Sequence, residues 1–161
     1  MIRNVKLTDA EQIVAIYNYY VVNSIVTFDQ VPFTASDFVE KIETIAAKYP
    51  FIVFEENQKV LGYAYANMWR QKPAYKHTVE TTVYIDNNAQ GRHIGSILYT
   101  ELLKRLKDQN YHVAIGGLTL PNDPSVRLHE KFGFKQVAHF KEVGFKFDTW
   151  LDVGFWQLSL D

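Results

Sequence analysis

The chain has 161 residues, of which 47% are hydrophobic and 15% aromatic, a composition that argues against disorder and allows one sizeable core. Its formal net charge is −1 and no like charges run together, which argues against a nucleic-acid or membrane-surface partner. The absence of cysteine excludes disulfides, zinc–thiolate sites and a cysteine nucleophile.

No repeat, low-complexity tract or linker interrupts the chain, so we expect one domain over residues 1–161. The first residues contain no apolar signal region, and no stretch approaches the length of a transmembrane span. The sequence therefore predicts a cytoplasmic protein without a membrane partner.

Two amphipathic helices and three strands are expected in the first half of the chain. The capping box Thr8-x-x-Glu11 predicts the start of the first helix, and Thr34 precedes the second, which ends before Tyr49-Pro50. The elements are a strand over 2–6, a helix, a loop over 24–32, a helix, and strands over 51–54 and 60–69. Helical spacing predicts as inward residues Ile13, Ile16, Tyr17 and Tyr20, then Phe38, Ile42 and Ile45.

The segment 78–85 is the most informative strand. Alternation places Val79, Thr81, Val83 and Ile85 on one face and Thr78, Glu80, Thr82 and Tyr84 on the other. If the second face lines a cleft, the carboxylate of Glu80 can act as a general base on an incoming ammonium. The alternative is a solvent-exposed strand residue without a catalytic role.

The second half of the chain predicts a long helix, a strand, a short helix and a final hairpin. These elements cover about 94–109, 111–119, 125–131 (stopped by Gly133) and 134–160. The inward stripe of the long helix would be Ile94, Leu98, Leu102 and Leu106, flanked by Ile97 and Leu103. The order β-α-α-β-β-β-α-β-α-β-β indicates an α/β (α+β) fold with a mixed sheet and helices on its faces.

The run Gln90-Gly91-Arg92-His93-Ile94-Gly95 lies between a strand and the start of the long helix. Free N–H groups and the helix dipole make such a junction suitable for a pyrophosphate group, and Arg92 can add a charged contact. The run is neither a Walker A loop nor a G-x-G-x-x-G fingerprint. The alternative is an ordinary turn into a helix.

The run from Leu120 to Phe134 carries a third candidate motif. Ser125 or Asp123 can cap a short helix, and the amide of Asn122 can hold a peptide-like cofactor arm. His129 can donate or accept a proton near neutral pH; the alternative is a histidine packed at the helix edge.

A basic cluster with an aromatic neighbour, Arg70, Lys72 and Tyr75, follows an apolar strand. Cations beside a tyrosine suit a carboxylate or phosphinate ligand, although a solvated basic loop is the alternative. None of His77, His93, His112 and His139 has a partner at metal-ligand spacing, so no metal site is expected.

In this order the motifs resemble the GCN5-related N-acetyltransferase (GNAT) superfamily, and more narrowly its phosphinothricin / methionine sulfoximine N-acetyltransferase group. The resemblance covers nearly the whole chain. Besides the runs above it includes Ile16-Tyr17-Asn18, Thr27-Phe28, Gly62-Tyr63-Ala64-Tyr65-Ala66, Ala74-Tyr75, Thr78-Val79-Glu80-x-Thr82-Val83-Tyr84 and Trp150-x-Asp152-Val153-Gly154-Phe155-Trp156-Gln157.

The resemblance implies a mixed, partly split sheet that holds acetyl-CoA in its opening. The cofactor would contact the backbone of Val83, Tyr84 and Ile85, the loop of Gln90, Gly91, Arg92, His93, Ile94, Gly95 and Ser96, and the side chains of Asn122 and Ser125. Glu80 would be the base, and His129 would replace the tyrosine that protonates the departing thiolate in many members. An amino-acid-like substrate would contact Arg70, Lys72 and Tyr75, with Thr27 and Phe28 closing the pocket. The resemblance also implies a homodimer with the pocket near its interface.

Two departures from the family pattern concern loops. His93 stands where glycine is usual, and histidine tolerates left-handed backbone better than most residues. The segment 144–150 lacks the usual His-Gly pair, which leaves the substrate preference open. Two alternatives remain at this point: an enzyme with another acceptor (a polyamine, an aminoglycoside or a protein N-terminus), and a non-catalytic acyl-CoA-binding module. The pair Arg70/Lys72 favours a small anionic acceptor.

Overall fold

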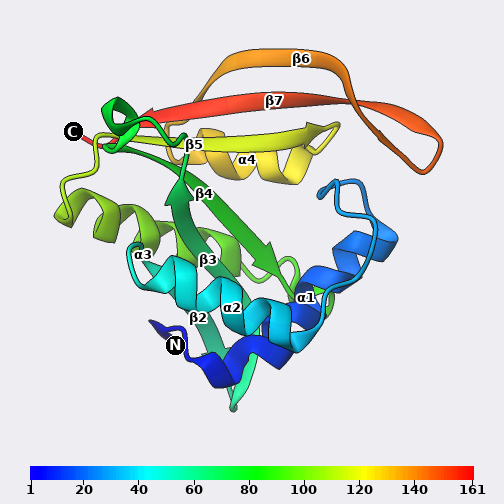
Figure 1. The fold of residues 1–161 in the computed structure, drawn as a ribbon, viewed down its shortest axis with the longest axis vertical. Helices are drawn as coiled ribbons and strands as arrows, with labels where there is room; N and C mark the ends of the chain where they lie inside the picture. The colour runs from blue at the N-terminus through cyan, green and yellow to red at the C-terminus, as the bar shows by residue number, and fades with distance from the viewer.

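A seven-stranded mixed sheet, in the order β1-β2-β3-β4-β5-β7-β6, runs through the molecule (Figure 1). The structure is a computed structural model that describes residues 1–161. The strands are β1 (Ile2–Asn4), β2 (Phe51–Glu56), β3 (Lys59–Met68), β4 (Thr78–Ile85), β5 (Val113–Leu120), β6 (Lys135–Lys146) and β7 (Thr149–Ser159). The α-helices are α1 (Ala10–Asn23), α2 (Ala35–Ala46), α3 (Ile94–Asp108) and α4 (Asp123–Lys131), with 3-10 turns η1 (Leu7–Asp9), η2 (Pro73–Tyr75) and η3 (Asn87–Ala89). The predicted order of elements is confirmed.

The sheet splits between its two central strands. β4 and β5 are its only parallel pair, and they are paired only over Thr78–Glu80 and Val113–Ile115. Beyond Glu80 the two strands diverge (Figure 1), whereas β4 stays paired with β3 to Ile85. The expectation of a mixed, partly split sheet is therefore confirmed.

Helices cover both faces of the sheet and enclose a separate apolar core on each. The inward residues predicted for the first two helices lie in one core, beneath α1 and α2. The other core contains the stripe of α3, including Leu98 and Leu102. The four predicted inward residues of α3 are buried; of the two flanking residues Leu103 is buried and Ile97 is 42% exposed, and Tyr99, which was not predicted, is buried as well. Successive helical residues are about 100° apart around the helix axis, so Ile97 lies at the edge of the apolar stripe, on the side away from Leu98 and Leu102.

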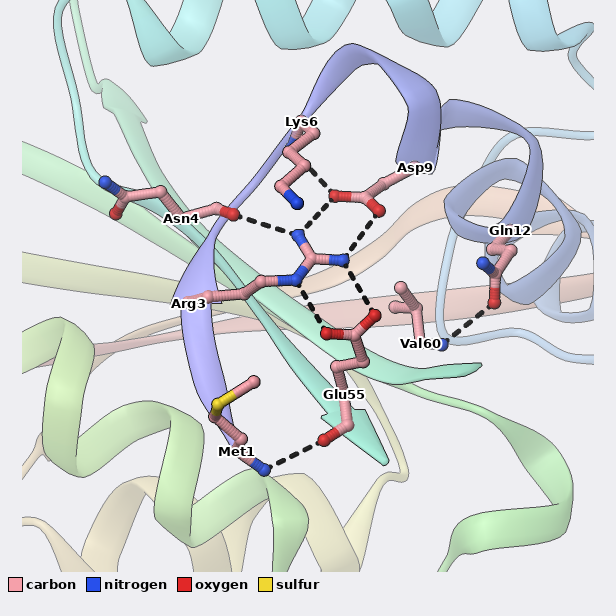
Figure 2. A network of polar contacts seen from close by, with 8 residues as sticks. All are labelled: Met1, Arg3, Asn4, Lys6, Asp9, Gln12, Glu55 and Val60. Atoms are coloured by element: carbon pink, nitrogen blue, oxygen red, sulfur yellow. Dashed lines mark hydrogen bonds and ion pairs between the residues drawn. The ribbon is translucent and has the colours of Figure 1, made fainter. Parts of the chain in front are cut away.

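The start of α1 depends on an ion-pair network that the sequence did not predict (Figure 2). Arg3 donates to both carboxylate oxygens of Asp9, at 2.8 and 2.9 Å, and to Glu55 at 2.9 Å. Asp9 also accepts the backbone N–H of Lys6 at 2.7 Å, so the expected capping box at Thr8 is wrong. Burial raises the pKa of Asp9, but the hydrogen bonds from Arg3 and Lys6 outweigh it, and the net pKa is lowered.

Two other local predictions can be compared with the structure. Thr34 caps α2 as expected: its Oγ1 accepts the N–H of Asp37 at 3.2 Å, and the Asp37 carboxylate accepts the N–H of Thr34 at 2.8 Å. The turn between β2 and β3 is tighter than predicted, because only Asn57 and Gln58 lie between the strands, with φ of 51° and 65°. No helix has the length and apolarity that crossing a bilayer requires.

Candidate active site

A cavity of about 810 Å³ lies in the opening between β4 and β5. Its wall is made by α1, β4, the loop before α3, the first turn of α3, β5 and α4. The structure brings most of the predicted donor-binding and catalytic residues into this wall. These are Glu80, Val83, Tyr84, Ile85, Gln90, Gly91, His93, Ile94, Gly95, Ser96, Asn122, Ser125 and His129.

The loop before α3 presents a helix N-terminus to the cavity. Gly91 has φ +79°, with open space where a Cβ would lie. His93 adopts the left-handed conformation with φ 62°, which histidine accepts more readily than most side chains. The first turn of α3 contains no acidic residue, so its N–H groups and dipole are available to an anion. These features fit the diphosphate of a nucleotide-like donor.

Arg92 lies outside the cavity wall, unlike its neighbours in the loop. Its guanidinium pairs with Glu56 at 2.8 Å, at the end of β2. A cation that the sequence did not single out contacts the first turn of α3: Lys131 of α4 donates to Ser96 Oγ at 3.1 Å. Arg127, also on α4, lines the cavity. Only the packing of α4 beside α3 reveals these two cations.

The backbone of β4 offers hydrogen-bonding groups to the opening. In the β3–β4 ladder the N–H of Asp86 donates to Leu61 at 2.8 Å. Because alternate residues of an antiparallel strand point to opposite sides, Val83 and Ile85 direct their N–H and C=O groups away from β3, toward the opening. The carbonyl of Ile85 already accepts the hydroxyl of Tyr20 from α1. Val83 is therefore the residue of β4 that best suits an amide-containing ligand.

Tyr20 also contacts the start of the loop before α3, because its hydroxyl accepts the side-chain N–H of Gln90 at 2.9 Å. Tyr20 was expected in the core, and its ring is indeed buried. Its hydroxyl nevertheless lies at the cavity, where it connects α1 to the end of β4 and the start of the loop.

Glu80 is the last residue of β4 that pairs with β5, so its side chain lies where the sheet opens. The carboxyl is partly buried and forms no ion pair. Burial raises its pKa. A carboxylate with a raised pKa, facing a cavity, is suited to accept a proton near neutral pH.

His129 lies in the same wall and is 2% exposed. Its Nδ1 lies 2.7 Å from the carbonyl oxygen of Ser125, and its Nε2 lies 2.9 Å from the hydroxyl of Tyr99. A Cβ on Gly116 of β5 would lie 2.6 Å from Nε2, so only glycine allows the ring to approach the strand. Burial lowers the pKa of His129, and the hydrogen bond to Ser125 partly opposes this.

The cap of α4 differs from the expectation. Asn122 is the N-cap residue, and its side-chain oxygen accepts the N–H of Ser125 at 3.4 Å. The predicted caps, Ser125 and Asp123, lie inside the helix instead. The side-chain oxygen of Asn122 is thus used in the cap, whereas its side-chain NH₂ group remains available to a ligand in the cavity.

The five residues expected to contact the acceptor do not line the cavity. Thr27 and Phe28 lie on the loop after α1, where Thr27 Oγ1 bonds to the hydroxyl of Tyr17 at 2.7 Å and its carbonyl accepts Lys146 at 2.8 Å. The other three, Arg70, Lys72 and Tyr75, follow β3. There Arg70 lies 4.5 Å from the centre of the Trp69 ring, against which Tyr75 also packs. Their contact with substrate stays a prediction.

A split mixed sheet with a glycine-containing helix start in its opening defines the class of the protein. Residues 2–154 match the acetyltransferase (GNAT) domain family, so the chain belongs to this family of acetyl-transferring enzymes. The fold, the family and the enzyme class expected from the sequence are confirmed.

Among its relatives, a phosphinothricin N-acetyltransferase of Streptomyces viridochromogenes is 39% identical over 99% of this chain and 87% of its own length. An L-methionine sulfoximine/L-methionine sulfone acetyltransferase of Pseudomonas aeruginosa is 33% identical over 99% of this chain and 94% of its own. A solved phosphinothricin acetyltransferase of Sinorhizobium meliloti, in complex with AcCoA, superimposes with a TM-score of 0.95 at 31% identity, covering 99% and 87% of the two chains.

Proposed function

We propose that this chain binds acetyl-CoA between β4 and β5 and transfers the acetyl group to the amine of a small amino-acid-like substrate. The substrate class is that of its relatives: phosphinothricin, methionine sulfoximine or sulfone, or a related L-amino acid. The observation that carries the proposal is Glu80, a half-buried carboxyl without an ion-pair partner, at the point where the cavity begins.

The donor would be held by main-chain groups more than by side chains. The N–H groups at the start of α3 suit its diphosphate, and the backbone of Val83 suits the amides of its pantetheine arm. Asn122 and Ser125 lie on the opposite wall, where they can contact the same arm. Arg92 would join the diphosphate only by leaving Glu56.

In the proposed mechanism Glu80 accepts a proton from the substrate ammonium, directly or through water, since only the free amine is nucleophilic. When bound, acetyl-CoA supplies a thioester carbonyl for the amine to attack. The N–H of Val83 would stabilise the oxyanion that forms, and losing such a donor typically costs about 3 kcal/mol. His129 would assist departure of the thiolate as an acid. Because a thiol with a pKa of about 8.5 leaves readily, this assistance is helpful rather than indispensable.

The acceptor would reach the cavity from the side of the loop after α1. Arg70, Lys72 and Tyr75 are the proposed contacts for its anionic end, and Thr27 and Phe28 would close the pocket. Since none of the five lines the cavity of one chain, a homodimer that joins this side to a second copy is part of the proposal. Its proposed setting is the cytoplasm.

An exposed apolar face on the final hairpin supports the homodimer. It consists of Val137, Phe140, Val143, Phe145, Phe147 and Trp150, each between 48% and 63% exposed. The loop after α1 adjoins this face, because Phe28 packs against Gly144 and Gln30 donates to the carbonyl of Phe145 at 3.3 Å. An apolar face of this kind suits burial against an identical one.

Titration calorimetry with acetyl-CoA, followed by a thiol-release assay over a panel of amines, tests the proposal. Release with methionine sulfoximine, methionine sulfone, phosphinothricin or ordinary amino acids is the expected result. Thiol release only with a polyamine, an aminoglycoside or a peptide would assign a different acceptor and leave acetyl-CoA as the donor. Binding without release across the panel would instead support an acyl-CoA-binding module.

A further inference from the structure

The two ring nitrogens of His129 have different partners, Ser125 and Tyr99, and both partners line the cavity. Nδ1 faces the carbonyl of Ser125 at 2.7 Å, and a carbonyl only accepts, so Nδ1 carries the proton of the neutral ring. Ser125 Oγ, at 3.5 Å from the same nitrogen, competes poorly. Nε2 therefore has the lone pair and accepts the hydroxyl of Tyr99 at 2.9 Å. In this form the ring has no proton directed at the cavity.

The hydroxyl of Tyr99 has a second partner at the split of the sheet. Thr81 Oγ1 lies 3.0 Å from it and 3.5 Å from the carbonyl oxygen of Ile115. With a neutral ring, Thr81 donates to Tyr99 and Tyr99 donates to His129. With a protonated ring, Nε2–H donates to Tyr99, and the phenolic proton is free to be donated elsewhere. This series of hydrogen bonds can therefore transfer a proton from His129 through Tyr99 to the cavity.

We propose that His129 passes its proton to the departing sulfur through the hydroxyl of Tyr99, so that the two residues act as one proton donor. This inference rests on the proposed function. As the C–S bond of the tetrahedral intermediate breaks, its electron pair stays on sulfur, which takes the phenolic proton of Tyr99. The Tyr99 oxygen takes the proton from Nε2 of His129. The ring returns to its neutral form, with Nδ1–H still on Ser125, and solvent restores the proton later.

The electrostatics of the pair agree with this direction of transfer. Burial raises the pKa of Tyr99, the hydrogen bond with Thr81 partly opposes this, and the charge of Glu80 raises the pKa further, so the neutral phenol is strongly favoured. Glu80 of β4 is the carboxyl whose charge acts on Tyr99, Arg127 of α4 lines the same cavity, and β5 contributes the uncharged Gly116 beside the His129 ring. Because burial lowers the pKa of His129, the contribution of the pair grows as pH falls from neutrality.

A double-mutant cycle with Tyr99→Phe and His129→Gln tests the coupling. The phenylalanine keeps the ring, and Thr81 retains the carbonyl of Ile115 as an acceptor. We expect each single variant to lower kcat about tenfold, the double variant also about tenfold, and the affinity for acetyl-CoA to stay unchanged. Tyr111→Phe is the control, because Tyr111 is partly buried at the end of α3 but outside the cavity; its kcat should be unaltered. A kcat about a hundredfold lower in the double variant would mean that the two residues act independently, and would overturn the proposal.

Nitrogen-15 NMR of His129 in the ligand-free protein gives a second test that needs no activity. The expected spectrum has a protonated Nδ1 and an unprotonated Nε2, and Tyr99→Phe should shift Nε2 while Tyr111→Phe leaves it in place. A protonated Nε2 in the neutral ring, or an Nε2 indifferent to Tyr99→Phe, would refute the relay. Failure of the proposed function would appear separately, as absent thiol release with the expected NMR result.

Discussion

Arg92 and Glu56 form an ion pair of 2.8 Å that connects the loop before α3 to the β2–β3 hairpin. The pair is solvent-exposed on both sides, so its energy is small, and it withholds from the cavity a cation that the sequence assigned to the diphosphate. The ion pair and the donor would therefore compete for one guanidinium.

Removing the competitor should strengthen donor binding. We expect Glu56→Gln to lower the Kd for acetyl-CoA by about two- to fivefold at low salt, with the gain fading at high salt. Calorimetry at two ionic strengths measures this. Asp108→Asn breaks an exposed pair at the far end of α3 and serves as the control. Equal affinities of Glu56→Gln and the control would leave Arg92 outside the donor site.

Glu80→Gln should lower kcat about 100-fold or more and leave the Kd for acetyl-CoA unchanged, because the amide cannot accept the ammonium proton. Since burial raises the pKa of Glu80, wild-type kcat should decline as pH falls through that pKa, when the base becomes protonated. The variant should lose this decline. Glu40→Gln, on the exposed side of α2, is the matched control. A pH–rate profile that Glu80→Gln leaves intact would assign the base to another group.

The conformation of His93 gives a prediction on backbone strain. At φ 62°, His93→Gly should be tolerated, with acetyl-CoA affinity within about threefold of wild type, whereas His93→Val should weaken binding because a β-branched residue avoids the left-handed region. Calorimetry on both variants, with thermal melting to monitor folding, compares the effects. Equal losses in both would show that the imidazole itself contacts the donor.

The network around Arg3 predicts a loss of stability without a loss of binding. Asp9→Asn leaves Glu55 as the only carboxylate partner of the Arg3 guanidinium in a part-buried site and should cost about 2 kcal/mol in urea unfolding at pH 7. The pKa of Asp9 is lowered below its ordinary 3.8, so its contribution is present above that value and disappears as pH falls through the lower, folded-state pKa. Wild type and variant should thus converge in acid. Asp108→Asn, in an exposed pair, should change stability by less than about 0.5 kcal/mol.

Trp150→Asp should convert the proposed homodimer into a monomer, because it adds a charge at the most exposed of the apolar side chains of the final hairpin, one that contacts Phe145. Light scattering after gel filtration measures the mass. Val22→Asp, which changes another exposed apolar residue, on α1, should leave the dimer intact. A wild-type monomer at micromolar concentration would refute the interface outright.

The sequence predicted correctly those helices and strands that are determined by residues close to one another in the chain. Strand β4 has the predicted bounds, 78–85, because alternation along it separates two buried faces. The start of α2 after Thr34 was predicted correctly, because the contacts that fix it lie within three residues of Thr34. Helical spacing identified the four inward residues of α3, but a pattern of apolar residues could not tell that Tyr99 is buried with them.

The sequence predicted most of the residues that meet at the cavity, but not the contacts between residues far apart in the chain. The loop 90–96 and Glu80 form continuous motifs, and the structure brings both to one cavity. The partner of Arg92 lies 36 residues away, and that of Tyr99 lies 30 residues away, so neither leaves a periodic signal. A tyrosine hydroxyl within an apolar stripe was the one hint of the Tyr99–His129 contact, since buried hydroxyls need partners.

The short pairing of β4 with β5 has a consequence for what the molecule can admit. Where the strands part, β4 keeps an unsatisfied edge of the kind that in other proteins recruits a neighbouring chain. Here that edge lines the cavity, whose wall α3, β5 and α4 also form. A slender molecule with its own amide groups can complete the ladder there, so the architecture itself favours an elongated ligand before any side chain takes part.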